Sequence, residues 1–352
     1  MNHYKHNEYV LSGDTYLSTD DVLLQPSYGK VASRSDIPLW PYIYSAPMDT
    51  VTDINSYFKF LNNGVIPVLS RIFLDKIIKC INFDIERGDI NLELYFQGFF
   101  SIGSSIEDFE KIKKLYNSLN VVHKPNLKIA VDIAHGWSVN GMDQIKRLQD
   151  LGIRNIMSGS IATPEAVVEL FDAGTTHVRA GIGGGAMCST RVMTGCGVPN
   201  LSNIFTLYKE IRDAQRIGKD NMVLIADSGI KNPGDIVKYI SAGADAVMIG
   251  TLFASCSDSP APLVDGKKIH RGQASRSFQV ERLGTLRNNC AEGIEKALTP
   301  DITIKEKVEW IDGGVRSAIS YLGQKKLSDL NPRNVKFLRT SHASLSESYP
   351  MK

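Results

Sequence analysis

The chain has 352 residues, of which 43% are hydrophobic and 22% are charged, and its formal net charge is +2. This composition is typical of a globular protein, and the balanced charge argues against nucleic acid as a partner. No apolar run approaches the roughly 20 residues that cross a bilayer, and the N-terminal residues contain no signal-peptide core, so we expect a cytoplasmic protein without a membrane partner. Five cysteines without a C-x-x-C pair disfavour both a disulfide framework and structural zinc.

The first half of the chain alternates between apolar segments and amphipathic patterns. The apolar segments predict strands at 43–48, 64–70, 94–103 and 127–134. Apolar residues at helical spacing predict helices at 53–63, 74–86, 106–119 and 142–151. This half therefore contains four strand–helix units in succession.

The second half continues the alternation and adds a repeated glycine rhythm. Its predicted strands are 155–161, 177–183, 222–229 and 246–253, and its predicted helices are 164–173, 204–216 and 233–242. Three times, one glycine follows a helix and a second glycine follows the next strand, in the pairs Gly152 and Gly159, Gly174 and Gly181, and Gly243 and Gly250. The first glycine is typical of a helix end in left-handed geometry, and the second of a close backbone approach.

Eight apolar strands that alternate with helices predict a closed parallel (β/α)8 TIM barrel. An open, doubly wound sheet is the alternative, and the strand count favours the barrel. No break in composition marks a second domain, so we expect residues 1–352 to form a single domain. In such a barrel the chemistry lies at the carboxyl ends of the strands, and the segments that follow the predicted strands are accordingly small, polar and rich in glycine.

The segment 181–200, GIGGGAMCSTRVMTGCGVPN, carries the candidate nucleophile. Cys188 follows a glycine-rich loop at the predicted catalytic rim, which is an unusual place for the buried, inert thiol that is the alternative interpretation. A thiolate nucleophile needs a lowered pKa or a nearby base. Thr190 supplies only a hydroxyl, so further partners must come from elsewhere in the chain. We interpret Cys196, in the same loop, as structural.

Other candidates follow the fourth, seventh and eighth predicted strands. Asp227 ends the seventh strand, where a carboxylate can hold a ribose. Gly229, Gly250 and Thr251 lie where barrels of this class bind phosphate, although the glycines alone could simply permit tight turns. After the fourth strand come Asp132 and His135, the latter either a base or an ordinary loop histidine.

These segments contain motifs that resemble the IMP dehydrogenase / GMP reductase family along nearly the whole chain. The matching motifs are STDDVLLQPSYGKVASRSD (18–36), SAPMDTVT (45–52), VDIAHGWS (131–138), GIGGGAMCSTR with TGCGVP (181–199), IADSGI (225–230), GDIVKYISAGADAVMIGTLFA (234–254) and GGVRSAISYLG (313–323). The cysteine loop is highly specific in combination with the ADSG and MIGT segments. The resemblance implies the same (β/α)8 barrel as the strand count.

The resemblance further implies a purine nucleotide oxidoreductase with NADPH, or NAD, as cofactor. Cys188 would attack C2 of the purine and form a covalent thioimidate, and Thr190 would help to polarise water or the leaving amine. The implied substrate contacts are Ser45 and Asp227 at the ribose, Met48 at the purine, Gly229, Gly250, Thr251 and His270 at the phosphate, and Gln273 and Ala274 in the flap. The implied cofactor contacts are Asp132, Ala134, His135 and Gly183, and the carbonyls of Gly183, Gly185 and Cys188 resemble a potassium site.

The size of the chain favours one branch of the family. No regulatory CBS modules are inserted, and the predicted active-site flap at about 270–312 has nearly the length found in GMP reductases. We therefore expect reduction of GMP by NADPH to IMP, ammonia and NADP, in a homotetramer. The alternatives are oxidation of IMP by NAD and water to XMP, action on another purine nucleotide, and a nucleotide-binding regulatory paralogue without activity.

The flap departs from the family pattern in ways that bear on proton transfer. Reductases carry a glutamate where this chain has Arg276, which makes Arg276 the candidate catalytic residue of the flap and leaves open whether Glu281 or Glu292 replaces the acid. The family's phosphate-binding tyrosine is His270 here, and a protonated histidine would add positive charge. Ala186 stands where the family has a serine.

Overall fold

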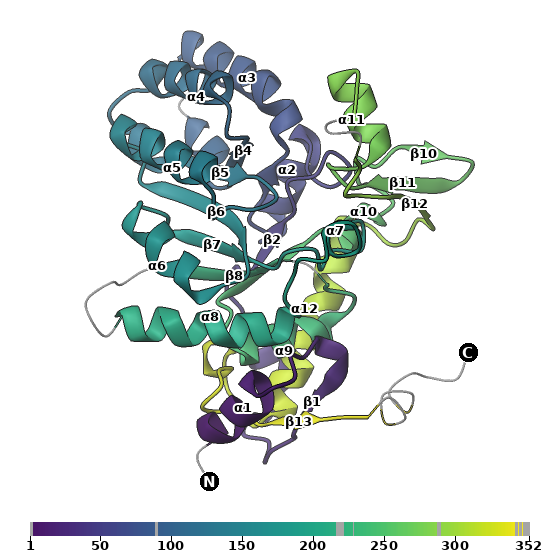
Figure 1. Cartoon of the computed structure of the whole chain (residues 1–352). Coiled ribbons are helices and arrows are strands. Elements are labelled where there is room, and N and C mark those ends of the chain that lie inside the picture. The colour runs from purple at the N-terminus through teal and green to yellow at the C-terminus, as the bar shows by residue number, and fades with distance from the viewer. Residues whose placement is uncertain are drawn as a thin grey trace.

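The computed structural model describes residues 3–88, 91–215, 222–227, 229–286 and 290–341, together with 344 and 347. At its centre lies an eight-stranded parallel sheet in the order β2-β9-β8-β7-β6-β5-β4-β3. A parallel bridge between Tyr44 and Ile66 joins the two end strands, and the Ile66 amide donates to the carbonyl of Ile43 at 2.9 Å. The sheet is therefore a closed ring, and the predicted (β/α)8 barrel is confirmed (Figure 1).

Each predicted strand position contains a strand of the ring. The strands are β2 (Ile43–Ser45), β3 (Val68–Leu69), β4 (Phe99–Ile102), β5 (Lys128–Asp132), β6 (Asn155–Ile161), β7 (His177–Ala180), β8 (Val223–Asp227) and β9 (Ala246–Ile249). Most of their residues are buried, because helices cover the outer face and side chains fill the interior. Residue 228, inside one predicted strand, lies outside the described residues.

The prediction of a strand from residue 94 is wrong, because Asn91–Phe96 form a 3₁₀ helix, η4, and β4 begins at Phe99. The buried hydroxyl of Tyr57 donates to the carbonyl of Tyr95 at 2.7 Å and accepts from the amide of Gly98 at 2.9 Å. Backbone groups that a longer strand would pair with its neighbour are therefore satisfied by a side chain.

The helices surround the ring, and seven of them lie at the predicted positions. They are α2 (Ile54–Asn62), α3 (Leu74–Glu86), α4 (Ile106–Ser118), α5 (Val139–Leu151), α6 (Pro164–Asp172), α8 (Asn200–Gln215) and α9 (Pro233–Ser241). The unpredicted α12 (Ile304–Tyr321) begins at a capping box formed by Thr303 and Glu306. It packs against α9 and supplies the eighth helix of the barrel.

The glycine rhythm is confirmed at the helix ends and only partly at the strand ends. Gly152, Gly174 and Gly243 have φ values of 104°, 100° and 115°, as expected for left-handed helix ends. Gly159 and Gly181 also have positive φ, whereas Gly250 has φ −107° and caps the short helix α10 (Thr251–Ala254). The third repeat therefore ends in a helix N-terminus and not in a left-handed turn.

A long segment between α10 and α12 forms a separate layer beside the barrel mouth. It contains β10 (Leu263–Val264), β11 (Lys267–Arg271), α11 (Arg276–Leu283) and β12 (Glu295–Leu298), which Figure 1 shows together near α7 (Thr190–Thr194). Its two ends are bonded to each other, because the Asp301 amide donates to the Ser255 carbonyl at 2.8 Å and the Ser257 amide to the Ile302 carbonyl at 3.1 Å. The segment leaves and rejoins the barrel at one place.

The N-terminal and C-terminal segments pack together. The buried Asn7 of α1 (His3–Ser12) donates to the carbonyls of Pro332 and Val335. The strand β1 (Val22–Leu24) pairs antiparallel with β13 (Phe337–Arg339). None of the described helices is both long enough and apolar enough to span a membrane.

Candidate active site

The exposed thiol of Cys188 is the first member of a chain of hydrogen bonds at the barrel mouth. Its Sγ donates to the hydroxyl of Thr190, with 3.1 Å between the two atoms. The Thr190 hydroxyl in turn donates to Oε2 of Glu292 at 2.9 Å. A proton can therefore pass from the thiol through the hydroxyl to a carboxylate, which is the base that a cysteine nucleophile needs.

Backbone pairing fixes Glu292 in this position. The Ser189 amide donates to the Glu292 carbonyl at 2.9 Å, and the Glu292 amide donates to the Ala274 carbonyl at 3.1 Å. Gly293 bridges to Cys188 on one side and to Ser275 on the other. Residues 292–294 therefore lie as an extended piece between the cysteine loop and the start of the flap.

Only glycine fits in the middle of this arrangement. A Cβ at Gly293 would lie 2.9 Å from the Ser275 amide nitrogen and 3.2 Å from the Met187 carbonyl oxygen. Both neighbours are backbone atoms, which cannot move aside as a flexible side chain would. The close approach of three backbone segments is what brings the carboxylate of Glu292 to Thr190.

Glu292, and not Arg276, contacts Thr190 in the described structure. Arg276 is the exposed first residue of α11, and within the described part of the chain no contact joins it to Cys188 or Thr190. Glu281, the other acid left open, pairs instead with Arg271. Of the two acids left open, Glu292 is therefore the one that contacts Thr190.

Asp132 and Asp227 are brought together by a third residue, Arg179 of β7. Nη1 of Arg179 lies 2.6 Å from Oδ1 of Asp132, and its Nε and Nη2 lie 2.9 Å and 2.8 Å from Oδ2 of Asp227. Burial opposes the charge on the guanidinium, but the two carboxylates outweigh it and raise the pKa of Arg179. All three groups lie at the carboxyl ends of their strands, at the mouth of the barrel.

His270 links the first and last strand ends at the predicted phosphate side. Its Nδ1 lies 2.7 Å from the hydroxyl of Thr50, and its Nε2 lies 3.3 Å from the hydroxyl of Thr251. Burial lowers the pKa of His270 from 6.5 to about 4. His270 is therefore neutral at neutral pH and adds no positive charge in the ligand-free protein, so neutral groups and backbone amides remain to receive an anion.

The flap also contacts the loop that follows β2. The side-chain amide of Gln273 donates to the carbonyl of Pro47, next to Met48. Gly250 has no side chain, and a Cβ at this position would lie 3.5 Å from the sulfur of Met48. Ser45 is different, because it is fully buried and its hydroxyl already bonds Thr52 and the Val68 amide.

The remaining predicted contacts lie on the rim. Ala134 and His135 are exposed after β5, and Ala274 is exposed at the start of the flap. Gly229 approaches the cysteine loop, since a Cβ there would lie 3.6 Å from the carbonyl oxygen of Gly184. Ala134, His135 and Ala274 are therefore accessible to solvent, whereas Gly229 is half-buried against the cysteine loop.

The implied potassium site receives no support from the loop geometry. The Gly185 carbonyl accepts the Cys188 amide at 3.0 Å. Arg191 already brings a positive charge into the loop, where its guanidinium donates to the carbonyls of Ile182 and Val198 at 2.9 Å and 2.6 Å. The cation site stays a prediction.

Comparison with known proteins identifies the family of the chain. The model of the "IMP dehydrogenase / GMP reductase domain" family matches residues 16–351. The chain belongs to this family. Among its curated relatives, an inosine-5'-monophosphate dehydrogenase of Borreliella burgdorferi is 36% identical over 63% of this chain and 57% of its own length. A GMP reductase of Leishmania major is 35% identical over 74% of this chain and 54% of its own length.

The chain spans about half the length of these family members, and a Bacillus subtilis inosine-5'-monophosphate dehydrogenase, 33% identical, is covered over 56%. Relatives of both names match at similar identity. Membership of the family therefore does not distinguish IMP dehydrogenase activity from GMP reductase activity. That choice depends on the groups around Cys188.

Arg179 was missed in the sequence, and Glu292 was only one of two acids left open there. Arg179 is a lone charged residue inside the apolar strand HVRA, and a charge at a buried position was a signal available in the sequence. Glu292 is 102 positions from Thr190, and nothing in their spacing indicates contact.

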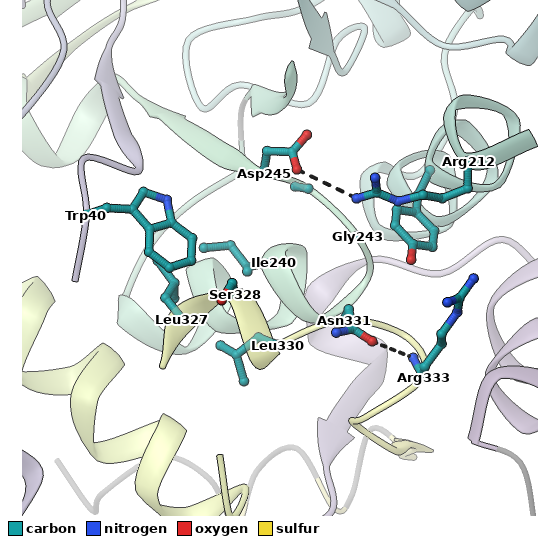
Figure 2. A pocket seen from close by; sticks show the side chains of 12 residues that line it. Trp40, Arg212, Ile240, Gly243, Asp245, Leu327, Ser328, Leu330, Asn331 and Arg333 are labelled. Carbon is teal, nitrogen blue, oxygen red and sulfur yellow. Dashed lines mark hydrogen bonds and ion pairs between the residues drawn. The ribbon is translucent and has the colours of Figure 1, made fainter. Parts of the chain in front are cut away.

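A separate hollow of about 430 Å³ lies at the opposite end of the barrel, where residues precede the strands. Figure 2 shows Trp40 and Leu327 on one side of it and Arg212, Arg333 and Asp245 on the other. Arg212 and Asp245 form a long ion pair of 3.9 Å across this wall. The hollow contains none of the residues predicted for catalysis.

Proposed function

We propose that this protein is a purine nucleotide oxidoreductase that reduces GMP to IMP and ammonia with NADPH. The observation that carries the proposal is the hydrogen-bonded chain from Cys188 through Thr190 to Glu292. It joins a nucleophile to a carboxylate that can store a proton and return it. Release of ammonia requires such a proton, because an amide ion is not a viable leaving group.

The hydrogen bonds from Cys188 through Thr190 to Glu292 account for the proton transfers of the reaction. As Cys188 attacks C2 of GMP, its thiol proton passes through the Thr190 hydroxyl to Glu292, and the carbon–sulfur bond forms. Glu292 then returns that proton through Thr190 to the amine at C2, which leaves as ammonia and yields the thioimidate. Hydride transfer to C2 expels the thiolate, which takes one proton from solvent. The sum is GMP, NADPH and one proton giving IMP, NADP and ammonia.

The other predicted contacts divide between the two ligands. Asp227 would accept hydrogen bonds from the ribose of the nucleotide, and Thr251 with the nearby backbone amides would receive its phosphate. Asp132, beside the exposed Ala134 and His135, would accept from a ribose of the cofactor. The bound cofactor supplies the hydride, and these residues orient it.

Oxidation of IMP is the second candidate, since the same chain could take a proton from water. Dehydrogenases of the family use an arginine–tyrosine pair in the flap for this purpose. The corresponding Arg276 is followed by Ser277 and is exposed, whereas Glu292 contacts Thr190 directly. The position of Glu292 supports the reduction of GMP. Oxidation of IMP stays the alternative, because relatives of both names match the chain.

The test is a panel of purine nucleotides with both cofactors in both redox states, followed by absorbance at 340 nm. We expect a loss of absorbance with GMP and NADPH. A gain with IMP and NAD, without activity on GMP, would reverse the direction. A protein that binds nucleotides but turns over none of them would be the regulatory paralogue.

A further inference from the structure

Arg179 is a buried cation between two buried carboxylates. Its side chain is 9% exposed, and those of Asp132 and Asp227 are 10% and 15% exposed. Two carboxylates and one guanidinium leave one negative charge in excess. Among the described residues, no other lysine or arginine forms an ion pair with either carboxylate, so Arg179 is their shared counter-ion.

The strand between these groups carries a glycine, Gly159, which leaves room for the contact between Arg179 and Asp132. β6 separates β5, which carries Asp132, from β7, which carries Arg179. A Cβ at Gly159 of β6 would lie 2.5 Å from the carbonyl oxygen of Arg179 and 2.6 Å from its Cβ. Any side chain at Gly159 would therefore displace Arg179 and its contact with Asp132.

Each carboxylate keeps an oxygen that Arg179 does not use. The guanidinium bonds Oδ1 of Asp132 and Oδ2 of Asp227. In the described structure no donor reaches Oδ2 of Asp132 or Oδ1 of Asp227. These oxygens can accept hydroxyl groups of a ligand while the ion pairs stay intact.

We propose that Arg179 is a positioning residue shared by the substrate and cofactor sites, holding Asp132 and Asp227 in a common orientation as their shared counter-ion. This rests on the proposed function, in which Asp227 serves the nucleotide and Asp132 the cofactor. Without the guanidinium, two buried like charges would face each other, and one of the carboxyl groups would take up a proton. Loss of the Arg179 side chain should then weaken the binding of both the nucleotide and the cofactor.

The test is a charge-balance rescue, measured by calorimetric titration with IMP. IMP carries no amine at C2, so it binds without deamination and reports affinity alone. Arg179→Met should weaken IMP binding by about tenfold or more, because the unpaired carboxylates share a proton. Adding Asp132→Asn to that variant removes one of the competing carboxylates, and IMP affinity should return to within about threefold of the wild type.

Controls separate this role from a purely structural one. Asp132→Asn alone should weaken NADPH and leave IMP binding nearly unchanged. If Arg179→Met does not fold, Arg179→Lys is the fallback variant: it keeps one positive charge but cannot bridge both carboxylates, so it should weaken IMP binding by about threefold or more, and adding Asp132→Asn should reverse that loss. Wild-type affinity in Arg179→Met, or a double variant that binds IMP no better than Arg179→Met, would overturn the inference while leaving the function intact. A wild-type protein that binds neither IMP nor GMP would overturn both.

Discussion

The substitution Glu292→Gln isolates the proton-storing step. Glutamine keeps an oxygen that can accept the Thr190 hydroxyl, 2.9 Å away, so the geometry of the relay is preserved. It cannot take up the proton that Cys188 releases through Thr190. General acid–base groups of this kind contribute about 100- to 10,000-fold to the rate, or roughly 2.7–5.4 kcal/mol of transition-state stabilisation. We expect kcat for GMP to fall within that range while IMP affinity stays unchanged.

The assay is NADPH oxidation under saturating GMP, with thermal unfolding to check that the fold is retained. The matched control is Glu295→Gln, which removes an exposed carboxylate only three positions away in β12. The control should keep wild-type activity. If Glu292→Gln retains more than about half of the wild-type rate, Glu292 is not the proton store and the mechanism proposed above is wrong.

Further substitutions and a pH titration test other parts of the site. Cys188→Ala should abolish turnover but keep IMP binding, and mass spectrometry of wild-type enzyme quenched with GMP should find the nucleotide on Cys188; turnover by the variant would exclude covalent catalysis. Gly293→Ala should lower kcat by about tenfold or more, because its Cβ would strike backbone atoms of the flap and cysteine loop; a wild-type rate would contradict the observed packing. Burial lowers the pKa of His177 and of His270 from 6.5 to about 4, so the folded state binds fewer protons than the unfolded chain. The free energy of unfolding should therefore decrease as pH falls from about 6.5 to about 4, by about 3 kcal/mol for each histidine, and a thermal melting temperature that is flat over this window would refute their burial as neutral groups.

The barrel was predictable because its strands are buried on both faces and appear as continuous apolar runs. The start of β4 was not predictable, because it depends on the hydroxyl of Tyr57, which lies 41 positions from the amide of Gly98 that it accepts. The helix α12 was missed, although the capping box of Thr303 and Glu306 marks its start.

The candidate site divides in the same way. The cysteine loop is contiguous in sequence, so Cys188 and Thr190 could be paired from their spacing alone. The position of Glu292 depends on backbone pairing between segments 187–189, 272–275 and 292–294, which no local pattern encodes. The charge state of His270 depends on burial, which the residue type does not reveal.

The bonded ends of the segment between α10 and α12 have a consequence for how this protein architecture can diversify. Because a hydrogen bond joins Ser255 and Asp301, the segment between these residues begins and ends at the same place on the barrel. Its length and composition can change without altering the distance between the two helices that flank it. Exchange of this segment between two enzymes could therefore replace the residues that transfer protons. The strands of the barrel and the thiol of Cys188 would remain unchanged.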